Sequence, residues 1–164
     1  MKNIYRVLAV MLVAVPCAVQ AQVTVRHLQP NEKALIADGV WAGDTLYLSG
    51  QLADPVKPAD AVTGAPAFYG DTKTQALSVL TKIRSLLKAQ GLDMKDVVKM
   101  TVFLAGDPAN GGKLDFAGLQ ASYTQFFGTA EQPNKPARSA MQVAALVAPW
   151  ALVEIEVIAV RGKQ

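Results

Sequence analysis

Near the C-terminal end of this sequence, charged side chains have the spacing to bind and activate a small organic acid. Arg138 begins one apolar run, and Glu154 and Glu156 interrupt a second run that ends at Val160. Side chains in an extended strand alternate between faces, so the two glutamates share a face and lie about 7 Å apart. Charged groups on a mostly apolar surface are costly unless they are paired or used. Arg138, Glu154 and Glu156 are therefore the candidates for a functional site.

These three side chains admit both a structural and a functional interpretation. Arg138 could form an ordinary surface ion pair, or it could bind a small carboxylate through two parallel N–H donors. One glutamate could pair with a basic group across an interface, and the other could hold a water molecule or transfer a proton. Composition leaves these interpretations open.

Other familiar catalytic patterns are absent from the sequence. His27 is the single histidine, and a lone histidine is more often structural than catalytic. The acidic residues lack the clustered spacing of a metal centre, so we expect no metal site. Ser49 lacks the preceding glycine of a nucleophile elbow, and no glycine-rich phosphate loop is present.

The elements that must position these charges alternate between strands and helices. The apolar spacing within residues 72–90 predicts the clearest helix of the sequence. Its buried side is expected to consist of Ala76, Leu80, Ile83 and Leu87. A second helix is expected at 114–127, and 52–70 predicts a loop. Strands are expected at 22–28, 40–50 (a hairpin), 96–104, 136–146 and 152–160, the last two joined by a short turn.

This order predicts an α+β fold in which one mixed sheet carries both helices on one face. The helices can cover only that face, yet Leu152, Ile158 and Val160 place apolar surface on the other. Such a surface is most simply buried by a second copy, so the pattern predicts a homo-oligomer.

Residues 1–21 have the layout of a secretory signal peptide. Lys2 and Arg6 precede an apolar run that is shorter than the roughly 20 residues of a membrane span, and small residues precede Gln22. Cleavage after Ala21 would leave one domain at 22–164, periplasmic or secreted, without Cys17, the single cysteine. Because the net charge would fall from +3 to +1, we draw no inference of nucleic-acid binding.

Six segments, in this order along the chain, resemble the reactive-intermediate deaminase family (RidA/YjgF-like, also called the L-PSP endoribonuclease family): 46–51, 75–77, 96–104, 123–127, 136–139 and 153–160. The resemblance implies a chorismate-mutase-like fold that assembles as a homotrimer, with ligand clefts between subunits. It also implies hydrolysis of enamines or imines derived from amino acids to a 2-oxo acid and ammonia, without a cofactor.

The resemblance also implies roles for individual residues. Arg138 of the Pro-Ala-Arg-Ser motif would bind the substrate carboxylate, with help from the backbone amide of Gly50, and Glu154 would assist a water molecule. Gln120 is expected to bind substrate where the family has an asparagine. Ile36 stands in place of a family tyrosine, and Ala140 in place of a frequent cysteine.

Three functions follow, of which the first is an exported imine or enamine hydrolase acting on a small carboxylate. The alternative is a non-catalytic module that binds small carboxylates. A ribonuclease, suggested by the older family name, is disfavoured because the mature charge offers no basic groove and no histidine pair is available. We expect no nucleic-acid partner and no membrane association after cleavage, and we expect the long segment 53–69 to reshape the cleft.

Overall fold

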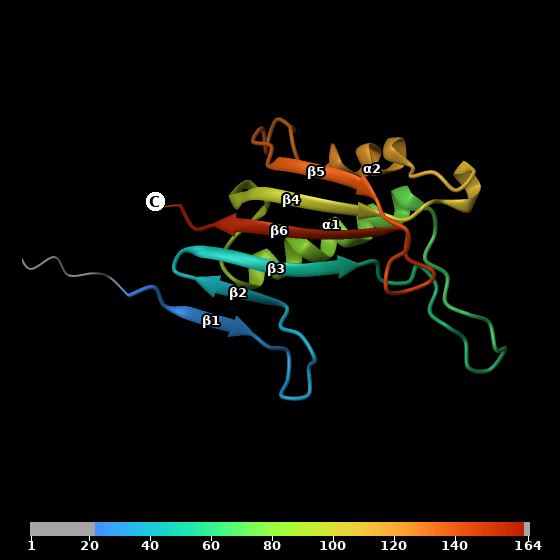
Figure 1. The fold of residues 1–164 in the computed structure, drawn as a ribbon, viewed down its shortest axis with the longest axis horizontal. Helices are drawn as coiled ribbons and strands as arrows, with labels where there is room; N and C mark the ends of the chain where they lie inside the picture. The colour runs from blue at the N-terminus through green and yellow to red at the C-terminus, as the bar shows by residue number, and fades with distance from the viewer. Residues whose placement is uncertain (1–21, 163–164) are drawn as a thin grey trace, which may run out of the picture.

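Six strands form one mixed sheet in the order β1-β2-β3-β6-β4-β5 (Figure 1). The strands are β1 (Val25–Leu28), β2 (Gly39–Ala42), β3 (Thr45–Leu52), β4 (Val97–Leu104), β5 (Ala137–Gln142) and β6 (Val153–Val160). Every neighbouring pair is antiparallel except β4 and β5, which run parallel. The computed structural model describes residues 22–162, so the predicted signal peptide lies outside the described residues.

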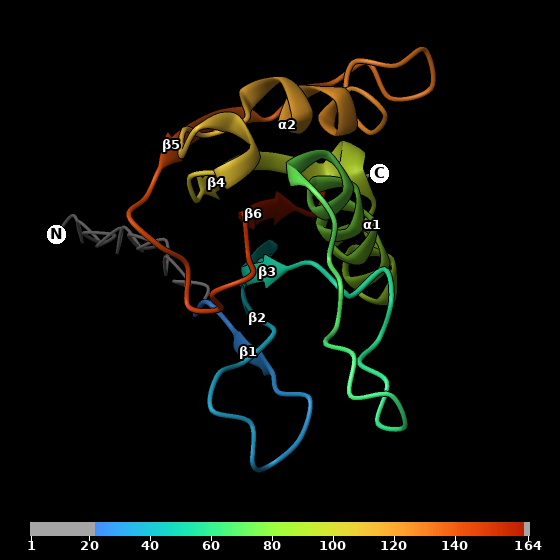
Figure 2. The same cartoon turned by 90° about the vertical axis from the view of Figure 1, so that its right-hand side faces the viewer.

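Two helices, α1 (Thr72–Ala89) and α2 (Phe116–Tyr123), cover one face of this sheet (Figure 2). Short 3-10 turns, η1 (Met94–Asp96) and η2 (Pro108–Asn110), flank β4. The predicted α+β architecture, a mixed sheet with both helices on one face, is confirmed. Among the described residues, no helix is both long and apolar enough to span a membrane.

Helix α1 forms where its sequence pattern predicts. The Asp71 side chain accepts a hydrogen bond from the Thr74 backbone N–H at 2.8 Å, which caps the first turn. The predicted stripe is fully buried: Ala76, Leu80, Ile83 and Leu87. Gly91 follows the helix with a φ of 74°, a left-handed conformation that suits glycine, so the helix stops there.

Strand β6 occupies the middle of the sheet, between β3 and β4. Its alternation is as predicted: Val153, Ile155, Val157 and Ala159 are buried toward the helices. The predicted short turn between the last two strands is wrong, because β5 ends at Gln142 and ten residues intervene before β6. The two strands are not neighbours either, since β4 lies between them.

The local backbone departs from the simple sequence pattern in β4 and in α2. Strict alternation along residues 96–104 would place Val98 on the buried face with Met100, but the register shifts between Val97 and Lys99, so Val97 is buried and Val98 is 48% exposed. The helix expected at 114–127 is shorter, and the turns that follow it bury Phe127 fully and Phe126 in part.

Gln75 holds the start of β6 in place. Its side chain is buried; its amide Nε2 donates to the Trp150 carbonyl at 3.1 Å and the Gly70 carbonyl at 3.2 Å, and its Oε1 accepts from the Leu152 N–H at 2.8 Å. The predicted loop at 52–70 folds into an arm with two isolated β-bridges, and Tyr69 at its base stacks on Trp150 with ring centroids 3.5 Å apart. One buried amide therefore joins α1, the arm and β6.

Candidate functional site

Gly50 and Glu154 lie against each other on neighbouring strands. The ladder between β3 and β6 is irregular between Leu48 and Gln51, and Gly50 occupies this irregularity. A Cβ added at Gly50 would overlap the Glu154 carboxylate oxygen Oε1 and lie 2.9 Å from its Cδ. The missing side chain of Gly50 is therefore what leaves space for the Glu154 carboxylate.

The environment of Glu154 favours the neutral form of its carboxyl group. Partial burial raises the pKa of Glu154 above its usual value, and the like charge of Glu156 raises it further. A carboxylate with a raised pKa is a stronger base and accepts a proton more readily from a bound water molecule. Glu154 is therefore suited to general acid–base chemistry.

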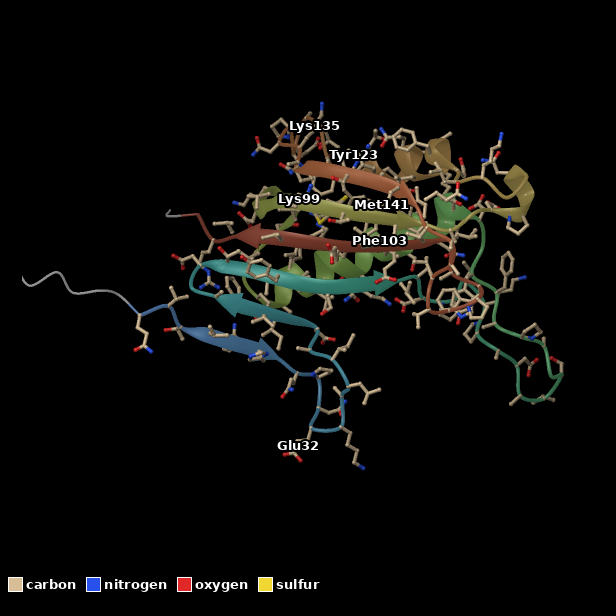
Figure 3. All side chains as sticks on the ribbon, in the orientation of Figure 1. Glu32, Lys99, Phe103, Tyr123, Lys135 and Met141 are labelled. Atoms are coloured by element: carbon tan, nitrogen blue, oxygen red, sulfur yellow. The ribbon has the colours of Figure 1, made fainter. Side chains whose placement is uncertain are left out.

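Both glutamates belong to the open face of the sheet, the face without helices. This face is turned toward the viewer in Figure 3, where Lys99 and Phe103 of β4 and Met141 of β5 are labelled. The Lys99 Nζ donates to the Ser139 Oγ at 3.1 Å across β4 and β5. A small hollow of about 120 Å³ on this face is lined by Tyr47, Leu48, Lys99, Thr101, Glu156, Val157 and Ile158.

Arg138 lies on the other face, beneath α2. It pairs with Met100 of β4, whose side chain is fully buried toward the helices. The guanidinium carbon lies 4.2 Å from the centroid of the Tyr123 ring and 5.7 Å from that of Phe116, which fixes the guanidinium plane through cation–π contact. The Nη1 nitrogen is buried and has no hydrogen-bond partner within the described residues.

Gln120 of α2 contributes a second unsatisfied atom to the same place. Its Oε1 is buried without a hydrogen-bond partner among the described residues. Gln120 and Arg138 line one hollow of about 460 Å³, which we call the Arg138 hollow; its other lining residues are Tyr123, Thr124, Phe127, Gly128, Lys135 and Pro136. Buried polar atoms are normally paired, so an unpaired donor and an unpaired acceptor in one hollow indicate a site for a polar ligand.

Tyr123 adds an aromatic wall to this hollow. Burial raises the pKa of Tyr123, and the positive charge of Arg138 opposes the shift only in part. The phenol therefore stays protonated near neutral pH and retains a hydroxyl donor.

The predicted site residues thus form two groups within one chain. Gly50 and Glu154 lie on the open face, whereas Arg138 and Gln120 lie on the helix side. Glu154 pairs with Phe103 of β4 and Arg138 with Met100, an offset of about 10 Å along the strand in addition to the opposite faces. A single chain therefore does not bring Arg138 to Glu154.

Two residues differ from the family pattern, and each lies near one of these groups: Ile36 near Gly50 and Glu154, and Ala140 near Arg138 and Gln120. Ile36 is 70% exposed, and its segment is fixed beside Gly50 because the Ser49 Oγ donates to the Ala37 carbonyl at 2.7 Å. Ala140 follows Arg138 by two positions on β5, so it faces the helix side as Arg138 does.

Sequence reasoning missed the contributions of Tyr123, Phe116 and Lys135. The helix expected at 114–127 contains both aromatic residues, but its pattern assigned neither of them a binding role. The spacing of Gln120 and Tyr123, three residues apart on a helix, places both on one surface and could have signalled a shared site. Lys135 carried no signal, because it reaches the hollow from the loop before β5.

The family model described as Endoribonuclease L-PSP matches residues 27–161. The chain belongs to the L-PSP endoribonuclease family. Curated relatives in this family include a protein named 2-iminobutanoate/2-iminopropanoate deaminase from Bos taurus, 38% identical over 81% of this chain and 81% of its own length. A protein of the same name from Salmonella typhimurium is 38% identical over 75% of this chain and 84% of its own length.

Solved structures of similar proteins agree with the fold. The crystal structure of Escherichia coli TdcF with bound serine is 33% identical, covers 82% of this chain and 94% of its own, and has a TM-score of 0.61. A Pseudomonas aeruginosa protein described as being of unknown function, PA3499, is 29% identical with a TM-score of 0.67, covering 84% of this chain and 93% of its own. The predicted chorismate-mutase-like fold is confirmed.

Within residues 22–162, no group of three or more His, Cys, Asp or Glu side chains is arranged to hold a metal ion. The candidate site residues offer a cation (Arg138), an amide (Gln120), a phenol (Tyr123) and a carboxylate (Glu154).

Proposed function

We propose that this protein hydrolyses a small imine or enamine carboxylate to a 2-oxo acid and ammonia, without a cofactor. The observation that carries this proposal is the pair of unsatisfied atoms in the Arg138 hollow. Arg138 Nη1 is a donor suited to a carboxylate, and Gln120 Oε1 is an acceptor suited to an N–H group. A ligand with a carboxylate beside a nitrogen that carries hydrogen would satisfy both. The deaminase names of the relatives and the serine bound in TdcF support this ligand class.

The proposed reaction needs water and one general acid–base residue. Glu154 accepts a proton from the water molecule as the water oxygen bonds to the imine carbon, and it then gives this proton to the imine nitrogen, which yields a carbinolamine. Glu154 next accepts the hydroxyl proton and returns it to the nitrogen as the carbon–nitrogen bond breaks, so that ammonia leaves and the 2-oxo acid remains. The raised pKa of Glu154 suits both the uptake and the return of a proton.

We further propose that the catalytic site forms between subunits of a homotrimer. Arg138 and Glu154 lie on opposite faces of one chain, so their joint action requires that a second copy supply one of them. The exposed side chains of Tyr47 and Met141 on the open face are surface that such a copy would bury. Light scattering of the purified protein tests this proposal, and a monomer at micromolar concentration would contradict it.

The alternative function, a module that binds a small carboxylate without turnover, is favoured by one observation. The Arg138 hollow is lined within a single chain, whereas hydrolysis also requires Glu154. Calorimetry with 2-oxo acids distinguishes the two functions, because binding without turnover would favour the module.

Export of the protein is proposed from residues 1–21 alone. Amino-terminal sequencing of the protein from a periplasmic or culture fraction should begin at Gln22. A cytoplasmic protein that keeps Met1 would contradict export and leave the proposed hydrolysis untouched.

The direct test of hydrolysis is ammonia release from enzymatically generated iminopropionate. The wild-type protein should release ammonia faster than the uncatalysed reaction, and Arg138→Ala should be much slower than the wild-type protein. Equal rates for the wild-type and Arg138→Ala proteins would show that the hydrolase proposal is wrong.

A further inference from the structure

We infer that the substrate of the Arg138 hollow carries two carboxylates, and that Lys135 binds the second one. This inference rests on the proposed function, because it specifies which class of imine that site accepts. It is drawn from the charges and position of the residues that line the hollow.

The lining of the hollow is positively charged and has no negative charge to balance it. Arg138 and Lys135 both contribute to it, and none of its lining residues is an aspartate or glutamate. The ion pairs within residues 22–162 are Lys82 with Asp54 and Arg84 with Asp93. Neither cation of the hollow is therefore neutralised by an acidic side chain in the described chain, and a single ligand carboxylate would balance only one of the two charges.

A glycine turn keeps Lys135 beside the hollow. Gly128 has a φ of 74°, and its N–H donates to the Gln132 carbonyl at 2.8 Å, which folds the loop after α2 back toward β5. A Cβ added at Gly128 would lie 2.5 Å from Cε of Lys135 and 3.4 Å from Nζ. The lysine side chain thus runs across the space that the glycine leaves open. Figure 3 labels Lys135 and Tyr123 near the beginning of β5.

The size of the hollow fits this class of ligand. Its volume of about 460 Å³ falls in the range of roughly 300–1,000 Å³ that is usual for small-molecule sites. A two- or three-carbon monocarboxylate would use Arg138 and leave Lys135 and part of the volume without a partner. An imine of a four- or five-carbon dicarboxylic 2-oxo acid would place its first carboxylate at Arg138 and its second at Lys135.

Binding of matched product analogues tests the inference without requiring turnover. The probes are 2-oxoglutarate and 2-oxopentanoate, which have the same chain length and differ in the second carboxylate. Calorimetry should show that the wild-type protein prefers 2-oxoglutarate by about fivefold, the upper range for a partly exposed ion pair. Lys135→Met should remove this preference while it leaves 2-oxopentanoate binding unchanged.

Lys88→Met is the matched control, because it removes the same charge from an exposed position on α1. It should keep the wild-type preference. Equal affinity of the wild-type protein for the two acids, failure of both to bind, or a preference that survives Lys135→Met would each overturn the inference. If 2-oxoglutarate is preferred but no imine is hydrolysed, the second-carboxylate site stands and the proposed hydrolysis does not.

Discussion

Replacing Gly50 with alanine is expected to remove most of the hydrolytic activity while the fold stays intact. The three atoms nearest to a Cβ at this position all belong to the Glu154 side chain: Oε1, Cδ at 2.9 Å and Cγ at 3.1 Å. None of them is a backbone atom, so the glutamate can rotate away and the sheet need not deform. Gly50 is also not among the glycines with positive φ, so alanine fits its backbone conformation.

The expected magnitudes separate activity from stability. Moving a catalytic group by about 1 Å costs on the order of 10²-fold in rate. That loss corresponds to about 2.7 kcal/mol of transition-state stabilisation, at 1.36 kcal/mol for each factor of ten. The free energy of unfolding should change by less than about 1 kcal/mol, because alanine also lowers the entropy of the unfolded chain.

The assay measures kcat for ammonia release from iminopropionate, and thermal unfolding of the same samples reports stability. Gly162→Ala is the control, because a Cβ there meets no atom within 4 Å and φ is not positive. It should match the wild-type protein in both measurements. A Gly50→Ala protein with wild-type kcat would refute the assignment of Glu154 as the acid–base residue, and an unfolded one would refute the assignment of the contact to a movable side chain.

Three further predictions concern Glu156, Arg138 and Gln75. Because burial and Glu156 raise the pKa of Glu154, kcat/KM should fall as the pH drops through that raised pKa and the base becomes protonated. Glu156→Gln should lower the pKa of Glu154 and so move this fall in kcat/KM to lower pH. A pH profile that does not move would contradict the assignment of Glu154 as the base. Arg138→Ala should cost about 2–4 kcal/mol in kcat/KM. Arg138→Lys should restore only part of this loss, because an ammonium group lacks two parallel N–H donors. Full recovery of kcat/KM with lysine would argue against paired donors. Gln75→Leu should lower the free energy of unfolding by about 2–4 kcal/mol, because it leaves the Leu152 N–H and two carbonyls without a hydrogen-bond partner. Urea titration measures this change, and a loss below about 1 kcal/mol would contradict the role given to Gln75.

Periodic burial explains why much of the fold could be predicted from the sequence. A strand with one buried face repeats every second residue and a helix every three or four, so β6 and α1 are evident from their apolar positions. Val98 shows where this reasoning fails. A one-residue register shift moves a side chain to the opposite face, and no local signal in the sequence marked that shift.

The arrangement of the candidate site could be predicted less well, because it depends on how the strands pair and in which register. The sequence indicated Arg138 and Glu154 as chemically important, but their placement on opposite faces follows from the strand registers, which pair Arg138 with Met100 and Glu154 with Phe103, three positions apart on β4. The unsatisfied oxygen of Gln120 and the approach of Lys135 depend on contacts between a helix, a loop and a strand. Such contacts between distant segments have no short-range pattern in the sequence.

The central position of β6 also has a consequence for how this domain folds. Segments β1 to β3 and β4 to β5 can each begin to order independently, but neither set pairs with the other until residues 153–160 enter between them. The decisive contacts are therefore distant in sequence, which slows folding relative to a protein with mainly local contacts. Until that last strand inserts, β3 and β4 present unpaired edges, and this is the stage at which the chain is most exposed to aggregation.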